Sequence, residues 1–112
     1  MQRRGQKLLW DVSEACSDIE RITSASSFDA YVADKDVRRL VERYLEIIGE
    51  ALRQFEHVES EATSLLPDLR GWVNLRNVVA HGYDALDDKT IWGTCRSAVP
   101  KLRADVLRLL EG

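Results

Sequence analysis

The segment RNVVAHGYD, residues 76–84, holds the side chains of this chain that are best suited to phosphate and proton-transfer chemistry. Arg76 offers a planar fork of N–H donors that matches phosphate oxygens. His81 supplies an imidazole, the side chain most often used to take or give a proton. Asn77 lies beside the arginine and could orient a phosphate or the histidine ring, and Tyr83 adds a phenol. These residue types suit RNA cleavage without a metal, with the arginine holding the charge that builds on phosphorus.

The same residues also fit a helix that only holds a bundle together. Arg76 could pair with Glu46 or Glu50 of a neighbouring helix, and His81 could lie at a helix C-terminus, where the dipole favours a cation. Asn77 and His81 are four residues apart and share a face. Arg76 and His81 are five apart, about 140° around an ideal helix. Therefore either the helix frays before His81, or two copies of the chain meet across a two-fold axis and share a cleft.

Amphipathic helices must position this segment, because apolar residues recur at steps of three and four nearly throughout the chain. The predicted helices cover about residues 5–23, 28–32, 35–55, 67–81 and 88–110. The predicted N-terminal caps are Ser26 or Ser27, Asp34, and Asp87 or Asp88. The polar stretch 57–63 should be a connection, and Pro100 should kink the last helix. Short connections between long helices predict an all-α antiparallel bundle of four to five helices.

Length, net charge and cysteine content limit the classes of protein to which this chain can belong. With 112 residues, the chain is expected to form a single domain over 1–112. Its net charge of −3 provides no global basic field, so an RNA function would need a local basic patch. Cys16 and Cys95 fall on apolar stripes and are expected to be buried free thiols. No stretch approaches the ~20 apolar residues of a membrane span, and no signal peptide is evident. We expect a cytoplasmic protein without metal or cofactor, because two separate histidines and two lone cysteines lack zinc-site spacing.

The motif resembles that of a known family. Arg76-Asn77, three residues, His81, one residue and Tyr83 is similar to the motif of HepT-type toxins, within the HEPN superfamily of helical nucleases. Other stretches resemble the family's segments as well, so the resemblance spans nearly the whole chain. They are LEIIGEA at 45–51, Asp87, Ile91-Trp92, and VPKL at 99–102.

The resemblance implies a fold, an activity and a partner. It implies an all-α homodimer whose cleft is lined by the motifs of both subunits. It implies the toxin of a type VII HepT/MntA toxin–antitoxin system, a metal-independent endoribonuclease acting on tRNA or mRNA. Arg76 and His81 match the catalytic pair, with Glu46 or Glu50 orienting the arginine. The implied partner is an MntA-like nucleotidyltransferase antitoxin, which would transfer AMP from ATP to Tyr83 and so block the site.

Two alternatives stay open at this point. The chain could be a non-catalytic subunit or binding module of a nucleotidyltransferase complex. It could also be a purely structural helical dimer, in which the polar motif only holds the bundle. Cleavage of RNA by the chain alone would distinguish a toxin ribonuclease from both of these alternatives.

Overall fold

The computed structural model describes residues 1–81 and 87–112, and every regular element in these two ranges is helical. The elements are α1 (Arg3–Thr23), α2 (Phe28–Ala33), α3 (Lys35–Val58), α4 (Ala62–Leu65), α5 (Leu69–His81), α6 (Asp88–Gly93), the π-helical segment η1 (Thr94–Ala98) and α7 (Val99–Glu111). The prediction of an all-α antiparallel bundle is confirmed.

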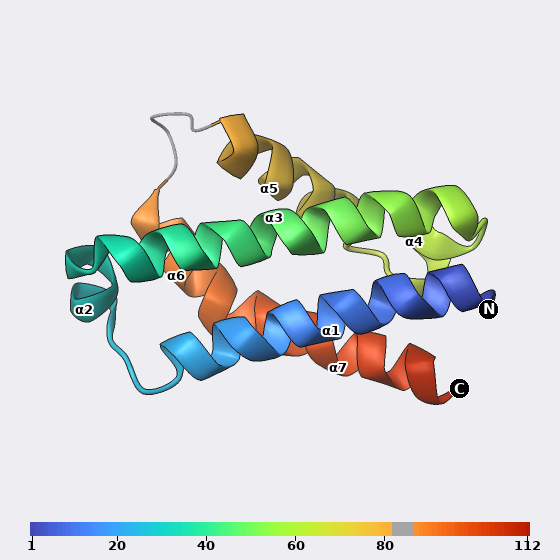
Figure 1. Cartoon of the computed structure of the whole chain (residues 1–112), viewed down its shortest axis with the longest axis horizontal. Helices are drawn as coiled ribbons and strands as arrows, with labels where there is room; N and C mark the ends of the chain where they lie inside the picture. Colours follow the sequence, from blue (N-terminus) through green and yellow to red (C-terminus); the bar gives the residue numbers. More distant parts are fainter. Residues whose placement is uncertain (82–86) are drawn as a thin grey trace.

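The four long helices form a bundle in the spatial order α5, α3, α1, α7 (Figure 1). α1 and α3 lie side by side along the long axis and run in opposite directions. α5 packs on α3, and α7 packs on the other side of α1. The two termini lie at the same end of the bundle. Because α5 contacts α3, residues of the central helix can position the side chains of the RNVVAHGYD segment.

Local sequence signals set several helix starts. Ser27 Oγ accepts a hydrogen bond from the backbone N–H of Ala30 at 3.1 Å, which begins α2. Asp34 Oδ1 accepts from the N–H of Val37 at 3.1 Å and begins α3. Asp87 Oδ1 does the same for α6, accepting from the N–H of Lys89 at 3.0 Å. Each cap satisfies one of the backbone donors that a helix start leaves without a partner.

The core follows the apolar stripes read from the sequence. It combines residues of α1, α3, α5 and the C-terminal run: Leu9, Val12, Cys16, Ile19, Val41, Leu45, Ile48, Leu52, Phe55, Leu69, Val99, Leu102 and Val106. Both cysteines are buried free thiols, as predicted, and burial raises the pKa of each to about 12. Thiols of such high pKa stay protonated and act as small apolar side chains.

Two predicted boundaries were wrong. The connection expected at 57–63 is shorter, because α3 continues to Val58 and the short α4 begins at Ala62. α5 begins at Leu69, later than the predicted start at Pro67. Polar stretches without an apolar period give little warning of a single helical turn. Among the described helices, none combines the length with the apolar character needed to cross a bilayer.

The sequence predicted that Pro100 kinks the last helix, and the structure has a π-helical turn just before this proline. Pro100 has no N–H to donate to the carbonyl of Arg96, so the α-helical pattern cannot pass through this point unchanged. The turn before it widens to η1, where the N–H of Val99 donates to the carbonyl of Thr94. Arg96 projects from η1 and donates to the carbonyl of Thr23, at 3.1 Å, at the C-terminus of α1. A cation at this helix end is favourable because it faces the negative end of the dipole.

Candidate active site on α5

Arg76 lies on α5 and leans against α3. Its Nη2 is 3.2 Å from Oε2 of Glu50, and its Nη1 donates to Oδ1 of Asn77 at 3.0 Å. The side chains of Arg76 and Glu50 are each about one-third exposed, 34% and 33%. Of the two carboxylates that the sequence offered, the structure pairs Glu50 with Arg76, whereas Glu46 lies 3.8 Å from Arg43. Two of the five guanidinium N–H groups are thus used in fixing the side chain, which leaves others for an anion.

Glu50 is itself held from several sides. Its Oε1 accepts from Arg53 Nη2 at 2.9 Å and from Gln54 Nε2 at 3.2 Å. Its Oε2 accepts from Arg53 Nε at 3.2 Å and faces Arg76. The hydrogen bonds from Arg53, followed by that from Gln54 and the charges of Arg53 and Arg76, lower the pKa of Glu50 to about 2. The carboxylate is therefore ionised and immobilised before any substrate arrives.

The roles of Arg53 and Gln54 were not predicted from the sequence. Both lie one turn after Glu50 on α3, at the spacings of three and four that allow side-chain contact. The Arg53–Glu50 ion pair is one contact of this kind, at a spacing of three residues. The sequence could not show that Glu50 of this pair also binds Arg76 of α5, because that contact depends on how α5 packs against α3.

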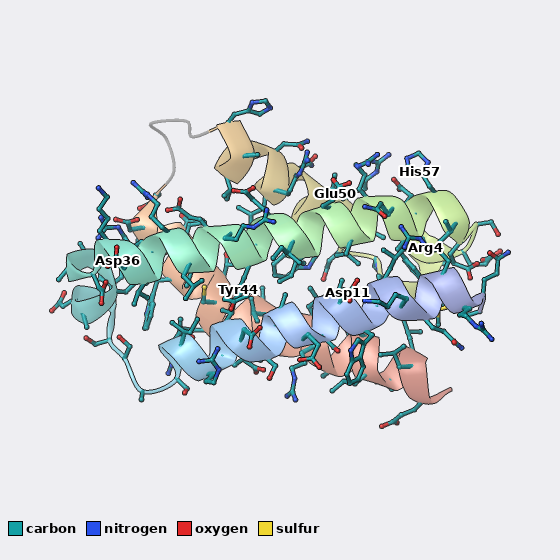
Figure 2. All side chains as sticks on the ribbon, viewed as in Figure 1. Arg4, Asp11, Asp36, Tyr44, Glu50 and His57 are labelled. Carbon is teal, nitrogen blue, oxygen red and sulfur yellow. The ribbon has the colours of Figure 1, made fainter. Side chains whose placement is uncertain are left out.

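A groove of about 480 Å³ lies between α1 and α3, and Arg76 of α5 is part of its lining. Figure 2 shows Arg4, Asp11, Tyr44 and Glu50 along it. Its charged lining is Asp11, Glu14, Asp18, Glu46 and Glu50 on the acidic side and Arg4, Arg43 and Arg76 on the basic side. Because acidic groups outnumber basic ones along this groove, it does not form the basic track that a nucleic-acid backbone prefers.

A second groove lies between α5 and the C-terminal run. It measures about 430 Å³ and is lined mainly by apolar residues such as Trp72, Leu75 and Leu102. It contains none of the motif residues. Of the two grooves, the one between α1 and α3 is therefore the one that contains the motif arginine, Arg76.

His81 is the last residue of α5 and its side chain is exposed. The helix continues through Arg76 and Asn77 to His81, so the chain does not fray before the histidine. On such a helix the directions of Arg76 and His81 differ by about 140°. One copy of α5 therefore does not aim both side chains at one point. Tyr83, the predicted AMP acceptor, and Gly82 lie outside the described residues.

No group of three or more His, Cys, Asp or Glu side chains within residues 1–81 and 87–112 is arranged to hold a metal ion. The polar groups that the described structure gathers around the motif are two arginines, one carboxylate and two amides: Arg53, Arg76, Glu50, Gln54 and Asn77. This set can bind and orient an anion such as phosphate.

The sequence of the chain matches a known family. Residues 12–109 match the family model described as Ribonuclease HepT-like, so the chain belongs to the HepT-like family. An inferred RNase of Methanocaldococcus jannaschii is 30% identical over 109 residues, covering 95% of this chain and 97% of that protein. The "Probable ribonuclease HepT" of Thermococcus cleftensis is 30% identical over 111 residues, covering 97% and 98%.

A bacterial relative extends this similarity. An inferred RNase of Caldanaerobacter subterraneus is 31% identical over 93 residues, covering 83% of this chain and 81% of that protein. No solved structure matches the chain.

Proposed function

We propose that this protein is a metal-independent endoribonuclease that cleaves tRNA or mRNA as the toxin of a type VII HepT/MntA toxin–antitoxin pair. The observation that carries the proposal is the Arg76 guanidinium, held by Glu50 and Asn77 on the helix that ends at His81, in a chain of the HepT-like family. The proposed chemistry needs both residue types, because the arginine stabilises charge on phosphorus and the histidine moves a proton.

The proposed reaction is attack of a ribose 2′-hydroxyl on the adjacent phosphorus. His81 takes the 2′ proton, the 2′ oxygen bonds to phosphorus, and the bond to the 5′ oxygen breaks. The leaving oxygen receives a proton, from water or from a second protonated histidine. The products are a 2′,3′-cyclic phosphate and a 5′-hydroxyl end. Arg76 directs its remaining N–H donors at the non-bridging oxygens, where negative charge develops.

The site is proposed to be shared between two copies of the chain. α5 is helical from Leu69 to His81, so Arg76 and His81 of one copy diverge. A two-fold axis beside α5 would place the arginine of one copy near the histidine of the other. The protein would then be a homodimer with two equivalent sites, each built from Arg76 of one copy and His81 of the other.

The ribonuclease proposal is tested with purified protein and an unstructured RNA labelled at one end. Wild type should produce fragments that end in a cyclic phosphate, in buffer containing a chelator. Arg76→Ala and His81→Ala should each lose cleavage. Arg70→Ala is the matched control, because Arg70 lies on the same helix, is exposed and pairs with Glu56 at 3.3 Å. Cleavage by both motif variants at the wild-type rate would refute the assignment.

The proposed off-switch is AMP transfer to Tyr83 by an MntA-like nucleotidyltransferase using ATP and magnesium. Its support is the position of the phenol in the sequence, two residues after His81. A phosphodiester and an adenosine at this position would put negative charge and bulk where substrate phosphate should bind. Co-expression with the transferase should raise the intact mass in AMP-sized steps and abolish cleavage. Tyr83→Phe should show neither effect. An unchanged wild-type mass with an active transferase would contradict the switch.

The same experiments separate the alternative function. A non-catalytic subunit of a nucleotidyltransferase complex would bind the transferase tightly but leave RNA intact in its absence. Growth arrest when the chain is expressed alone in the cytoplasm, relieved by the transferase, is the outcome expected of the toxin.

A further inference from the structure

Gly49 occupies an unusual place for a glycine, the middle of the longest helix. α3 runs from Lys35 to Val58, and Gly49 is buried within it. Glycine in a helix interior is less favourable than alanine, because it loses more backbone freedom on folding. A glycine at such a position therefore needs a compensating reason, and close approach of another backbone is the usual one.

The neighbouring atoms supply that reason. A Cβ atom built on Gly49 would lie 2.2 Å from Cβ of Arg76 and 2.8 Å from its Cγ. It would also lie 2.9 Å from the backbone carbonyl oxygen of Trp72, one turn earlier on α5. Two of these atoms belong to the rigid part of α5, so a rotamer change could not make room. Any side chain at position 49 would force α5 away from α3 or rotate it.

The glycine also adjoins the residue that holds the arginine. Glu50 follows Gly49 directly and is fixed by Arg53 and Gln54 from its own helix. The absence of a side chain at Gly49 therefore sets how closely α5 approaches α3. Glu50, the next residue of α3, sets the direction of the Arg76 side chain. A shift of α5 would move Arg76 away from a carboxylate that cannot follow it.

We propose that Gly49 is a positioning residue for catalysis, which lets α5 approach α3 closely enough for Arg76 to be held by Glu50. This inference rests on the proposed function, because it takes Arg76 to be catalytic. It concerns a residue that touches no substrate and acts only through the arginine.

The main test is Gly49→Ala in the full-length protein. Separation of α5 from α3 by about 1 Å would misplace Arg76, and misplacement of this size can cost about 10²-fold in rate. We expect kcat for RNA cleavage to fall about 10²-fold, with KM changed far less. Gly71→Ala and Gly93→Ala are matched controls, because a Cβ at either position would meet no atom within 4 Å. Both should retain the wild-type kcat.

A second comparison separates positioning from loss of stability. Val73→Ala removes buried apolar volume from the same helix and should lower the melting temperature without moving Arg76 along α3. At a temperature well below both melting transitions, Val73→Ala should keep kcat within a few-fold of wild type, whereas Gly49→Ala should not. Equal losses of kcat in the two variants would overturn the proposal.

Failure of Gly49→Ala to fold would still leave a decisive measurement. Arg76→Gly removes the two Arg76 atoms that the new methyl group would meet, and leaves the weaker contact with the carbonyl oxygen of Trp72 at 2.9 Å. Gly49→Ala combined with Arg76→Gly should then recover part of the folding that Gly49→Ala alone lacks. If the double variant is compared with Arg76→Gly alone, and Gly49→Ala destabilises it as much as it destabilises the wild type, the close-approach argument is contradicted.

The proposal and the proposed function fail in different ways. If Arg76→Ala cleaves RNA like wild type, the catalytic assignment itself is wrong. If Arg76→Ala is inactive while Gly49→Ala keeps the wild-type kcat, the ribonuclease assignment stands and only the role of Gly49 is refuted.

Discussion

Arg76 and His81 occupy the same helix but very different surroundings. Arg76 lies over the middle of α3, where Glu50, Arg53 and Gln54 form a connected polar network around it. His81 lies at the last residue of α5, with its side chain exposed. One member of the proposed pair is thus oriented by the fold of its own chain. The other lies at the exposed C-terminal end of α5.

This difference separates two tasks in catalysis. A group that stabilises developing charge is most effective when it is already fixed, because it then need not reorganise during the reaction. A proton-transfer group must instead reach the 2′-hydroxyl and exchange protons with solvent. We therefore expect substitutions of His81 to change activity, and substitutions near Arg76 to change stability as well, because they disturb the contact between α5 and α3.

The largest expected effect is the loss of cleavage in His81→Ala and Arg76→Ala. Removing a general acid–base group costs about 10²–10⁴-fold in rate, and removing a charge-stabilising group about 10²–10³-fold. The comparison also predicts a lower melting temperature for Arg76→Ala, because this variant removes one partner of Glu50. Cleavage rates of both variants and thermal unfolding of Arg76→Ala check this. An unchanged melting temperature in Arg76→Ala would contradict the comparison.

The second effect is recovery of activity when two inactive variants are mixed. If Arg76 of one copy works with His81 of the other, a dimer of Arg76→Ala with His81→Ala keeps one intact site. Random exchange makes half of the dimers mixed, so the mixture should recover about one quarter of the wild-type rate. Denaturing and refolding the variants together, followed by the cleavage assay, measures it. A mixture as inactive as its components would show that each site belongs to one copy.

A smaller effect is expected from Glu50→Gln. The amide preserves the shape but removes the charge that holds Arg76, so kcat should fall about 10-fold, near the cost of a weakened charge-assisted hydrogen bond. Glu46→Gln is the matched control, because Glu46 lies one turn earlier on α3 and pairs with Arg43 instead. It should change kcat less than about two-fold. Equal effects of the two substitutions would remove the special role assigned to Glu50.

The smallest effect concerns acid stability. The pKa of Glu50 is about 2 in the folded chain, below its ordinary value of 4.5, because Arg53, Gln54 and Arg76 favour the carboxylate. The unfolded chain therefore binds this proton more tightly, and the stabilisation is complete above pH 4.5 and lost as the pH falls toward 2. Urea unfolding should show a steeper loss of stability for wild type than for Glu50→Gln in this window. Parallel pH profiles would contradict it.

The sequence predicted the long helices, but not which side chains of neighbouring helices contact one another. Apolar stripes such as Leu45, Ile48 and Leu52 predicted which face of α3 is buried, because a 3.6-residue period leaves little choice. The stripe does not determine how far α5 slides along α3, so Glu46 and Glu50 remained equal candidates to hold Arg76. Their spacing of four residues puts both on one face, and only packing distinguishes them.

Gly49 is a sequence signal for close packing of another helix against α3. A glycine within a strongly amphipathic helix is unfavourable on its own, so it signals that another backbone approaches there. The sequence cannot name the approaching residue. Arg76 and Trp72 are revealed only once α5 is placed against α3.

The π-helical turn η1 has a consequence for how the chain tolerates changes in length. A π turn holds more residues than an α turn, and it sets the rotational phase between α6 and α7. Five π-helical residues turn through about the same angle as four α-helical residues, so η1 takes up one extra residue without changing the direction of the helix faces beyond it. Deleting one residue from 94–98 would let this turn become regular α-helix while Val99, Leu102 and Val106 still face the core. Deleting a residue within α7 would instead rotate the part beyond it by about 100°. We therefore expect the last helix to tolerate a one-residue deletion at η1 better than elsewhere.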